Sequence, residues 1–411
     1  MKRVCDVVVI GAGPAGLLAA GRAAMLGAKV LLLEKMEKPA RKLRITGKGR
    51  CNLANMRPLD EQLEQIHPEP RFLRQAFGAF FNRELIALLE ANGVPTKTER
   101  GHRVFPASDR AWDVAEALVA WAKGQGVEIV SRARVESLVI EDGAFAGLLF
   151  THGDATHRVE ARCGILATGG LSYPATGSTG DGHRFAEAAG HGIEPLRPSL
   201  VAIHTEPVCE ATGLRLRNVS LTLWVDGKKK ASEFGEAEFT DRGLDGPIVL
   251  RLSRQAVDHL AAGRRVEAAL DLKPSLDVPA LEARLERVFP PGAPLRDILR
   301  SLLPAPLVEV FAARLGPAPG RKQLIALLKD LRFQVTGHGP WEEAIVTAGG
   351  VALKGVDPRT LGSRVVENLF FAGEVLDLDA NTGGYNLQIA FSTGWLAGES
   401  AAKRLAHRTP L

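Results

Sequence analysis

The sequence of 411 residues contains no apolar run that approaches the ~20 residues needed to cross a bilayer. Its amino terminus is already predicted to form a buried strand, which leaves no room for a secretory signal peptide. Cysteine is scarce, and the four thiols show no metal-ligand spacing: Cys5, Cys51, Cys163 and Cys209. We therefore expect a protein of the reducing cytoplasm, with no metal site and no contact with a membrane.

Tyrosine is scarcer still, because Tyr173 and Tyr385 are the only two, and both lie in glycine-rich stretches. The chain has no internal repeat and no low-complexity segment. Neither sign of charge dominates, since 52 lysines and arginines against 47 acids give a net charge of +5. This mild excess permits an anionic partner such as RNA, although a basic protein that binds an anionic cofactor is the simpler interpretation. The length predicts two or three domains.

The first 34 residues carry the most informative pattern. An apolar run at residues 4–10 predicts a buried parallel strand. It continues directly into Gly11-Ala12-Gly13-Pro14-Ala15-Gly16. An Ala/Leu-rich helical run then ends at Gly27, and a second apolar run ends at Glu34. This order predicts a dinucleotide-binding unit rather than a chance glycine-rich turn: a strand, the G-x-G-x-x-G motif, a helix, a second strand and an acid.

Each position of this pattern has a physical role. Gly11 permits the tight turn, Gly13 lets the backbone approach a pyrophosphate, and Gly16 lets the helix pack close to the sheet. The helix N-terminus offers free N–H groups and a partial positive charge to the phosphates. Glu34 can accept the ribose hydroxyls of an adenosine and would repel a 2′-phosphate. The pattern therefore favours FAD or NAD over NADP.

A glycine-rich, basic stretch at residues 45–55 follows the second strand. Its composition is poor for a helix or a strand and predicts a loop with spare backbone N–H groups. Its position favours a second cradle for the cofactor, reaching toward the reactive ring, over a solvated basic loop. The predicted cofactor contacts here are Lys35, Lys42, Thr46, Gly47, Arg50, Cys51 and Asn52.

The middle of the chain alternates between helical and strand patterns. Residues 57–92 are predicted helical, 96–105 a hairpin, and a helix capped by Ser108 or Asp109 extends through Trp121. Strands are predicted at residues 128–130, 134–140, 145–151, 156–161 and 163–170, as in the small meander of flavin-binding Rossmann domains. From these strands we expect cofactor contacts by Val135, Ala167, Thr168 and Gly169.

The pattern changes near residues 195 and 340. Residues 195–255 are mainly strand-like, and 256–340 are mainly helical runs separated by prolines, at 279–289, 295–303, 306–315 and 321–331. We predict that 195–340 is an inserted substrate or cap domain. Residues 1–194 and 341–411 would then form one cofactor-binding domain.

A further buried strand is predicted at 369–373, followed by Glu374 and by a glycine-rich start of a helix that continues to about Arg404. An acid after such a glycine can bond a ribityl or ribose hydroxyl. The helix N-terminus can direct its dipole at the N1/C2=O edge of a flavin and stabilise the anionic reduced ring. In isolation a simple helix cap would explain the glycines, but the amino-terminal motif favours the cofactor. The predicted contacts are Gly373, Glu374, Gly384, Asn386, Leu387 and Gln388.

These motifs together resemble the YhiN/BaiN-type (BaiN/RdsA-like) NAD(P)/FAD-dependent flavoproteins over nearly the whole chain. The resemblance is carried by the amino-terminal motif with Glu34, by Thr46-Gly47-x-Gly49-Arg50-Cys51-Asn52, and by residues 167–170, 176–182, 347–351, 371–374 and 382–388. It implies an α/β fold: a Rossmann-type FAD-binding domain built from both chain ends, with a parallel sheet, helices on both sides, a β-meander crossover, and an inserted β-barrel-like plus helical domain. The chain departs from the family pattern at Asp241 and Asp245, where a His and a Ser are usual, so its substrate can differ.

The resemblance also implies a reductase of carbon–carbon double bonds, in bile acid intermediates or in a uridine of large-subunit ribosomal RNA. Hydride would pass from reduced FAD to an activated C=C while a side chain protonates the adjacent carbon. The candidate catalytic residues are Cys51, Tyr173 and Tyr385, against the simpler roles of a packed thiol and of aromatic lids. His102, His183 and His338 are weaker candidates. No second G-x-G-x-x-G follows a strand, so no separate NAD(P)-binding domain is predicted. NAD(P)H would then dock directly over the flavin as a transient reductant, or another protein would supply the electrons.

Three functional hypotheses remain open. The first is a reductase of a small unsaturated metabolite. The second is an RNA-modifying enzyme that makes dihydrouridine; it predicts that residues 228–230, 264–265 and 41–50 form one positive face. The third is a flavin-binding regulator without turnover, indicated only by Asp241 and Asp245.

Overall fold

In the computed structural model, the chain divides into two compact units, Met1–Arg197 with Val346–Leu411, and Pro198–Ile345. The structure describes residues 2–208, 210–288, 293–317 and 319–406. Cys209 and Phe289, which the sequence analysis includes, lie outside these ranges. The predicted boundaries, after residues 194 and 340, fall a few residues before those of the structure.

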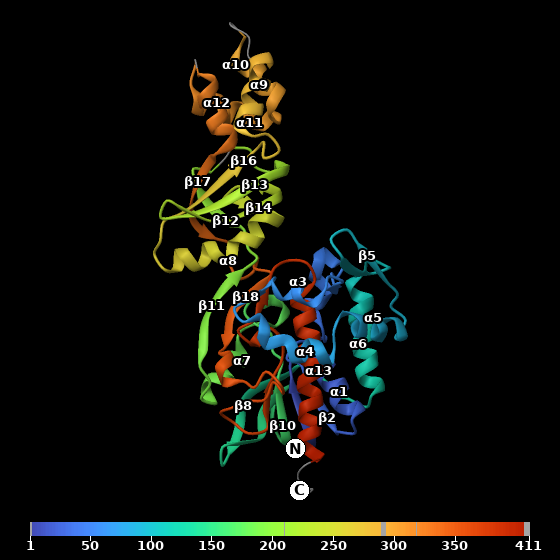
Figure 1. The fold of residues 1–411 in the computed structure, drawn as a ribbon. Helices are drawn as coiled ribbons and strands as arrows, with labels where there is room; N and C mark the ends of the chain where they lie inside the picture. The colour runs from blue at the N-terminus through green and yellow to red at the C-terminus, as the bar shows by residue number, and fades with distance from the viewer. Residues whose placement is uncertain (1, 209, 289–292, 318, 407–411) are drawn as a thin grey trace. The chain divides into compact units, whose positions relative to one another are not determined.

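A seven-stranded sheet forms the centre of the first unit, in the order β7-β2-β1-β10-β9-β8, with β19 paired to β10 (Figure 1). Its strands are β1 (Lys2–Ile10), β2 (Val30–Leu33), β7 (Glu128–Val130), β8 (Ala133–Glu141), β9 (Ala144–His152), β10 (Ala155–Leu166) and β19 (Leu369–Phe371). β7, β2, β1, β10 and β19 pair in parallel, whereas β8 and β9 pair antiparallel. Because β19 and β1 both pair with β10, the two ends of the chain meet in one sheet.

Two helices from opposite ends of the sequence pack together beside this sheet (Figure 1). They are α1 (Pro14–Met25) and α13 (Tyr385–Ala406). Gly394 and Gly398 of α13 make the close approach possible, since a Cβ at either would lie 2.2 Å from the carbonyl oxygen of Ala15 or Ala19, respectively. The packing of α13 therefore supports the helix that follows the glycine motif.

Shorter elements complete the first unit. The helices are α2 (Arg41–Ile45), α3 (Leu59–Leu63), α4 (Arg74–Ala79), α5 (Asn82–Ala91), α6 (Ala111–Gly124) and α7 (Asp181–Ala188). Short 3₁₀ turns are η1 (Thr46–Gly49), η2 (Pro70–Leu73), η3 (Pro174–Thr176), η4 (Leu353–Gly355) and η5 (Gly373–Val375). Small sheets pair β3 (Ala54–Asn55), β6 (Arg103–Pro106) and β5 (Thr96–Glu99); β11 (Ile193–Ser199) and β18 (Val346–Val351); and β20 (Asp379–Ala380) and β4 (Ile66–His67).

Three local predictions for this unit were wrong. Residues 57–92 are not one helical stretch, because α3, α4 and α5 are separated by β4 and η2. Neither Ser108 nor Asp109 caps α6, whose N-cap is Arg110 without a side-chain hydrogen bond. The two strands predicted at 156–161 and 163–170 are one strand, β10, whose first half pairs with β9 and whose last residues pair with β19.

The second unit contains a closed barrel in the order β12-β15-β14-β13-β16-β17. Its strands are β12 (Ile203–Glu206), β13 (Arg215–Val225), β14 (Lys228–Phe239), β15 (Gly243–Asp245), β16 (Val266–Asp271) and β17 (Leu331–His338). Inward apolar residues of these strands, such as Leu221, Leu223 and Val225 of β13, form its core. The barrel-like insertion predicted by the resemblance is confirmed.

Helices cover two ends of this barrel in Figure 1: α8 (Pro247–Ala261) lies at one, and α9 (Val278–Val288), α10 (Leu295–Leu302), α11 (Ala305–Leu315) and α12 (Arg321–Lys329) gather at the other. The helix predicted at 321–331 ends earlier, because Leu331 already begins β17. β16 and β17 come from the stretch predicted as mainly helical and were not predicted.

Candidate functional site

The turn after β1 has the geometry that the glycine motif predicts. Gly11 has φ +98°, and a Cβ there would lie 2.5 Å from the Ala167 carbonyl oxygen at the end of β10. A Cβ at Gly16 would lie 1.8 Å from the Gly11 carbonyl oxygen, so any larger residue would open the turn. A Cβ at Gly13 would meet no atom within 4 Å, which leaves that side of the backbone open to a ligand.

The N-terminus of α1 is suited to bind an anion. Gly13 is its N-cap and Pro14 its first residue; no side chain caps the helix, and its first turn carries no acid. The N–H groups of this turn therefore have no side-chain competitor, and the helix dipole adds partial positive charge. A diphosphate is a ligand that such a terminus can hold.

Glu34 lies at the end of β2 beside this turn. Its carboxylate accepts hydrogen bonds from the backbone N–H of Ala12 at 2.9 Å and of Met36 at 2.8 Å. Burial raises the pKa of the Glu34 carboxyl, and these donors only partly offset that effect. The two bonds fix the carboxylate next to the glycine turn, where a ribose hydroxyl can reach it.

The Lys35 side chain, predicted as a cofactor contact, bonds the loop before α7 and the first turn of that helix. Its ammonium donates to the Asp181 carboxylate at 2.7 Å and to the Thr179 hydroxyl at 2.5 Å. The pair ties the residue after Glu34 to the first turn of α7. Lys35 thus joins two loops of the site.

The loop around η1 is held in an unusual backbone conformation. Gly47, Lys48, Gly49 and Cys51 have φ values of +58°, +56°, +86° and +61°. Two of these residues are not glycine, so the surrounding structure must stabilise a conformation that costs about 1 kcal/mol for each. Backbone conformations of this kind concentrate at ligand sites.

Two side chains of this loop point inward. The Cys51 thiol is fully buried, and burial raises its pKa to about 12. The amide oxygen Oδ1 of Asn52 is buried and has no hydrogen-bond partner among the described residues. An unpaired buried acceptor is costly, and a donor from a ligand would satisfy it.

Arg50 stabilises the loop from outside. Its guanidinium donates to Glu99 at 2.5 Å and to Asp109 at 2.6 Å, and it lies 4.4 Å from the centre of the Phe105 ring. Lys97 also bonds Asp109, at 2.6 Å. Asp109, predicted as a helix cap, is therefore part of a surface ion-pair network that anchors the loop.

Lys42 and Glu374, both predicted to contact the cofactor, contact each other. The Lys42 ammonium lies 2.7 Å from the Glu374 carboxylate and 2.5 Å from the Ser172 hydroxyl. Glu374 also accepts from Ser172 at 2.7 Å and from the Thr347 backbone N–H at 2.8 Å. Ser172 and Thr347 were not among the predicted contacts, although Thr347 begins the 347–351 motif; Ser172 is 202 residues from Glu374 along the chain, and Thr347 is 27.

Burial acts to raise the pKa of the Glu374 carboxyl, but Lys42, Ser172 and Thr347 outweigh it and hold the pKa below its usual value. The side chains of Lys42 and Glu374 each keep 21% of their surface exposed. The pair is therefore ionised and still reachable on one side.

The end of β10 and the start of η5 complete this edge of the sheet. Thr168 Oγ1 is a second buried polar atom without a partner. Gly169 lies beside Ser178, since a Cβ there would be 3.1 Å from the hydroxyl oxygen. A Cβ at Gly373 would lie 2.9 Å from that of Ala15, which places η5 against α1. Val135 is buried in β8.

The start of α13 approaches the same region through β3. A Cβ at Gly384 would lie 2.4 Å from the Ala54 carbonyl oxygen. The side-chain amide of Asn386 accepts a hydrogen bond from the Ala380 backbone N–H through its oxygen and donates one to the Ala380 carbonyl through its nitrogen. Leu387 is half-buried. Gln388 is fully buried and donates to Ser392 at 2.9 Å, so it supports the helix rather than facing outward.

The two tyrosines differ in exposure. Tyr385 is buried in the first turn of α13, and burial raises the pKa of its phenol. Tyr173 is half-exposed, has φ +52°, and directly follows Ser172 of the Lys42–Glu374 network. Of the predicted proton donors, Tyr173 is therefore the most accessible beside the site.

Of the three histidines considered as acids, His183 interacts with Glu374 of the site. His102 is exposed in the turn before β6, and His338 ends β17 in the second unit. His183 is buried in α7, where burial lowers its pKa despite the nearby Glu374.

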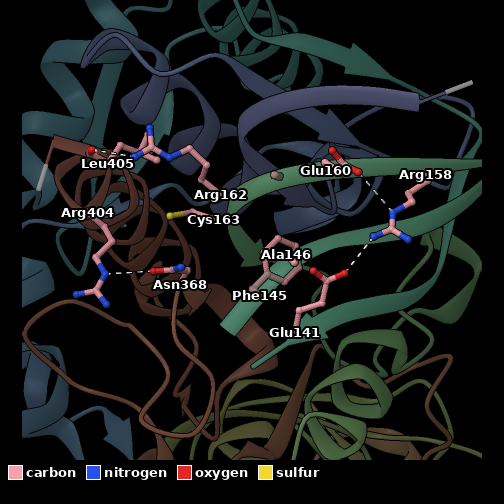
Figure 2. Close-up of a pocket in the computed structure, with 11 residues that line it drawn as sticks. Glu141, Phe145, Ala146, Arg158, Glu160, Arg162, Cys163, Asn368, Arg404 and Leu405 are labelled. Carbon is pink, nitrogen blue, oxygen red and sulfur yellow. Dashed lines mark hydrogen bonds and ion pairs between the residues drawn. The ribbon is translucent and has the colours of Figure 1, made fainter. Parts of the chain in front are cut away.

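A cavity of about 410 Å³ in the first unit is a separate feature (Figure 2). It is lined by β8, β9, the middle of β10 and the last turn of α13, and none of its residues belongs to the predicted site. Figure 2 shows its arginines already bonded: Arg158 to Glu141 and Glu160, and Arg404 to Asn368. Arg162 is bonded as well, to the Leu405 carbonyl, so each charged side chain of the described lining has a partner.

The described part of the structure contains neither a metal-binding cluster nor a membrane-spanning helix. Among the residues it describes, no group of three or more His, Cys, Asp or Glu side chains could hold a metal ion. Within the same ranges, no helix is both long and apolar enough to cross a membrane.

Taken together, the residues fit FAD. They supply an uncapped helix terminus beside an open glycine, a fixed carboxylate for ribose, and unpaired buried acceptors at Asn52 and Thr168. The start of α1, Glu34 and Thr168 follow the carboxyl ends of β1, β2 and β10, where nucleotides bind in open α/β sheets.

Known proteins share this architecture. The chain is 32% identical to the 3-dehydro-bile acid delta(4,6)-reductase of Clostridium scindens, over 96% of this chain and 98% of that protein. It is 31% identical to the ribosomal RNA dihydrouridine synthase of Escherichia coli, over 96% and 97%. The solved 3-ketosteroid-delta4-(5alpha)-dehydrogenase of Rhodococcus jostii covers 97% of both chains with a TM-score of 0.52 and 18% identity, a likeness of fold alone.

The chain also matches the HI0933-like protein Rossmann domain family over residues 5–400. The resemblance to YhiN/BaiN-type flavoproteins is thereby confirmed. The chain belongs to the HI0933-like family and is an FAD-dependent oxidoreductase.

Proposed function

We propose that this protein reduces an activated carbon–carbon double bond with electrons from NAD(P)H. One relative is a bile acid reductase and two are dihydrouridine synthases. Dihydrouridine is uridine with its ring C=C saturated, so both names describe the addition of hydrogen to an activated double bond. When bound, FAD supplies hydride transfer from its reduced ring.

The observation that carries the proposal is the convergence of the two chain ends at one edge of the sheet. The uncapped start of α1 suits the diphosphate, and Glu34 suits the ribose. The Lys42–Glu374 pair and the Asn52 amide present polar groups from the loops that follow β2 and β19. These positions suit a single extended dinucleotide.

We propose Tyr173 as the proton donor, in preference to Cys51 and Tyr385. Cys51 holds its proton too tightly in its buried position, and Tyr385 is enclosed by α13 and its neighbours. A half-exposed phenol next to the Lys42–Glu374 network can approach a substrate carbon and regain its proton from solvent.

The test is anaerobic reoxidation of the flavin. The FAD-loaded protein is reduced with dithionite and mixed with a steroid enone, with ribosomal RNA, or with buffer. We expect one acceptor to reoxidise the flavin with a matching yield of saturated product. Reoxidation by neither acceptor, in a preparation that oxygen reoxidises normally, would contradict the proposal.

Tyr173→Phe separates proton delivery from cofactor binding. We expect it to lower the reoxidation rate by about 10²-fold while FAD content stays unchanged. Tyr385→Phe and Cys51→Ser serve as matched comparisons; a larger loss in either would move the proton donor to that residue.

Dihydrouridine formation in ribosomal RNA is the second candidate. It is supported by Lys228, Lys229 and Lys230 of β14, which are exposed and form no ion pair with a described residue. Comparing dihydrouridine in ribosomal RNA with and without the gene tests it, and equal levels would remove it. The alternative of a regulator without turnover is set aside, because the family is one of oxidoreductases.

A further inference from the structure

Three buried amide side chains form a cluster around β3. They are Asn55, Gln62 and Asn82. The amide nitrogens of Gln62 and Asn82 each donate to the Asn55 backbone carbonyl at 2.7 Å. Burying an amide costs free energy unless hydrogen bonds within the protein replace those with water, so the cluster depends on these bonds.

The Asn55 side chain connects this cluster to the start of α13. Its amide nitrogen donates to the carbonyl oxygens of Gly383 at 3.0 Å and of Gly101 at 3.2 Å. Its amide oxygen accepts from the Arg57 backbone N–H at 3.1 Å. Both N–H donors and the acceptor are therefore in use, and the bond to Gly383 joins residues 328 apart in the sequence. A buried side chain bonded in this way fixes the backbone of three segments relative to one another.

The turn that precedes α13 consists of Gly383 and Gly384. Their φ values are +144° and +98°, a region that glycine adopts far more readily than other residues. Gly384 packs directly on β3, because a Cβ there would lie 2.4 Å from the Ala54 carbonyl oxygen. Neither glycine has a side chain that could hold the turn, so its position depends on the Asn55 bond and on this contact.

The turn leads directly into α13, which begins at Tyr385 and has no acid in its first turn. The N-terminus of a helix carries a partial positive charge, whose effect falls off within about one helical turn. A small displacement of the N-terminus of α13 therefore changes the free energy of a negative charge beside it.

Building on the proposed function, we propose that Asn55 is a positioning residue for the flavin. By holding the Gly383 carbonyl, it keeps the N-terminus of α13 where the helix stabilises negative charge on the N1/C2=O edge of the reduced ring. Asn55 is buried and all its side-chain groups are bonded, so it acts through the turn and not on the ring itself. The inference rests on the proposed function, because it requires a flavin bound at the start of α13.

The experiment measures the flavin without substrate turnover. The FAD-loaded full chain is titrated with sulfite, which adds to the oxidised flavin and leaves negative charge on its N1/C2=O edge. The midpoint potential of the flavin is measured in parallel. We expect Asn55→Ala to weaken sulfite binding by about fivefold or more and to lower the midpoint potential, because the displaced helix terminus stabilises the anionic ring less. The ratio of FAD to protein should stay unchanged.

Asn82→Ala and Asn92→Ala are the matched controls. Asn82 bonds the Asn55 carbonyl and not the turn, so its loss should lower stability in urea and leave sulfite binding unchanged. Asn92 is exposed at the end of α5 and donates to the Leu88 carbonyl at 2.7 Å, so its loss should change neither sulfite binding nor the potential. Equal weakening of sulfite binding in Asn82→Ala would overturn the proposal. Unchanged sulfite binding and midpoint potential in Asn55→Ala would overturn it as well.

A second variant covers the case in which Asn55→Ala does not fold. Asn55→Ser keeps a hydroxyl group in the cluster, and we expect the same loss of sulfite binding from it. If neither variant folds, Asn55 is required for the fold and the positioning role is overturned. The absence of a sulfite adduct with the unaltered, FAD-loaded protein would also overturn it.

These outcomes are distinct from those that test the reductase. A protein whose sulfite binding depends on Asn55 but which saturates no double bond refutes only the reductase. A protein that reduces an enone, and whose flavin is unaffected by Asn55→Ala, refutes only the positioning role.

Discussion

At the scale of single residues, the Lys42–Glu374 pair determines the charge of the candidate site. Both side chains are about four-fifths buried, and the carboxylate is matched by one ammonium and two neutral donors. Such a pair need not add net stability, but removing one partner leaves the other charge unmatched in a poorly solvated place.

Lys42→Met is therefore expected to destabilise the protein by about 2 kcal/mol, below the value for a fully buried pair because part of the site is exposed. Urea unfolding measures this loss, with Lys123→Met, an exposed lysine on α6, as control. The double variant K42M/E374Q should recover much of the stability. Equal stability of the two lysine variants would contradict the buried-pair account.

The same pair predicts a dependence on pH. Because the pKa of Glu374 lies below its ordinary value of 4.5, its contribution to folding is present above pH 4.5 and is lost as the pH falls through the folded pKa. Without Lys42, burial would raise that pKa, so K42M should be less destabilised relative to the unaltered protein at acid pH. A difference that stays constant from pH 7 to about pH 4 would contradict this assignment.

Cys51 provides a second test at this scale. A thiol with a pKa of about 12 is a thiolate in only about one molecule in ten thousand at pH 8. We expect iodoacetamide to leave Cys51 unmodified in the folded protein and to modify it fully in urea, as measured by peptide mass spectrometry. Rapid modification of the folded protein would show an accessible, activated thiol and restore its candidacy as a proton donor.

At the scale of secondary structure elements, the contact between α1 and α13 positions the uncapped start of α1. Gly394→Ala and Gly398→Ala would each place a methyl group against an α1 carbonyl. We expect each to destabilise the protein by about 2 kcal/mol and to weaken FAD binding. Gly124→Ala, in a helix with open space at that position, should instead stabilise by about 0.5 kcal/mol. FAD affinity unchanged in both α13 variants would contradict the coupling.

Elements with strong local patterns were predictable from the sequence. β1, α1 and β2 follow from apolar runs, glycines and an acid that are adjacent along the chain, and α11 matches the helical run predicted at 306–315. β16 and β17 were missed because β16 lies between two helices and β17 directly follows one, and their alternation is visible only once their barrel neighbours are known.

The candidate site was predictable in part for the same reason. Local motifs predicted Gly11, Gly13 and Glu34 in the positions that the turn requires. The partners of Glu374 could not be predicted, because Ser172 and Thr347 are brought to it by long-range folding. Asp109 resembles a helix cap in the sequence, yet its bonds go to Arg50 and Lys97. Whether each predicted residue contacts FAD stays a prediction.

At the scale of the whole molecule, the fold joins distant sequence into one sheet. β19 pairs with β10, which pairs with β1, so the loops after residues 10, 33, 166 and 371 open at the same edge. This arrangement is the physical basis for assigning a single extended dinucleotide to the chain. The barrel is a separate unit whose role in substrate binding stays a prediction.

The central claim is that these loops bind FAD in a form that NAD(P)H can reduce. The most direct measurement is the visible spectrum of the purified protein, before and after anaerobic addition of NADH or NADPH. We predict absorbance peaks near ~370 and ~450 nm that bleach with one of the two reductants. A colourless protein that takes up no added FAD would contradict the claim.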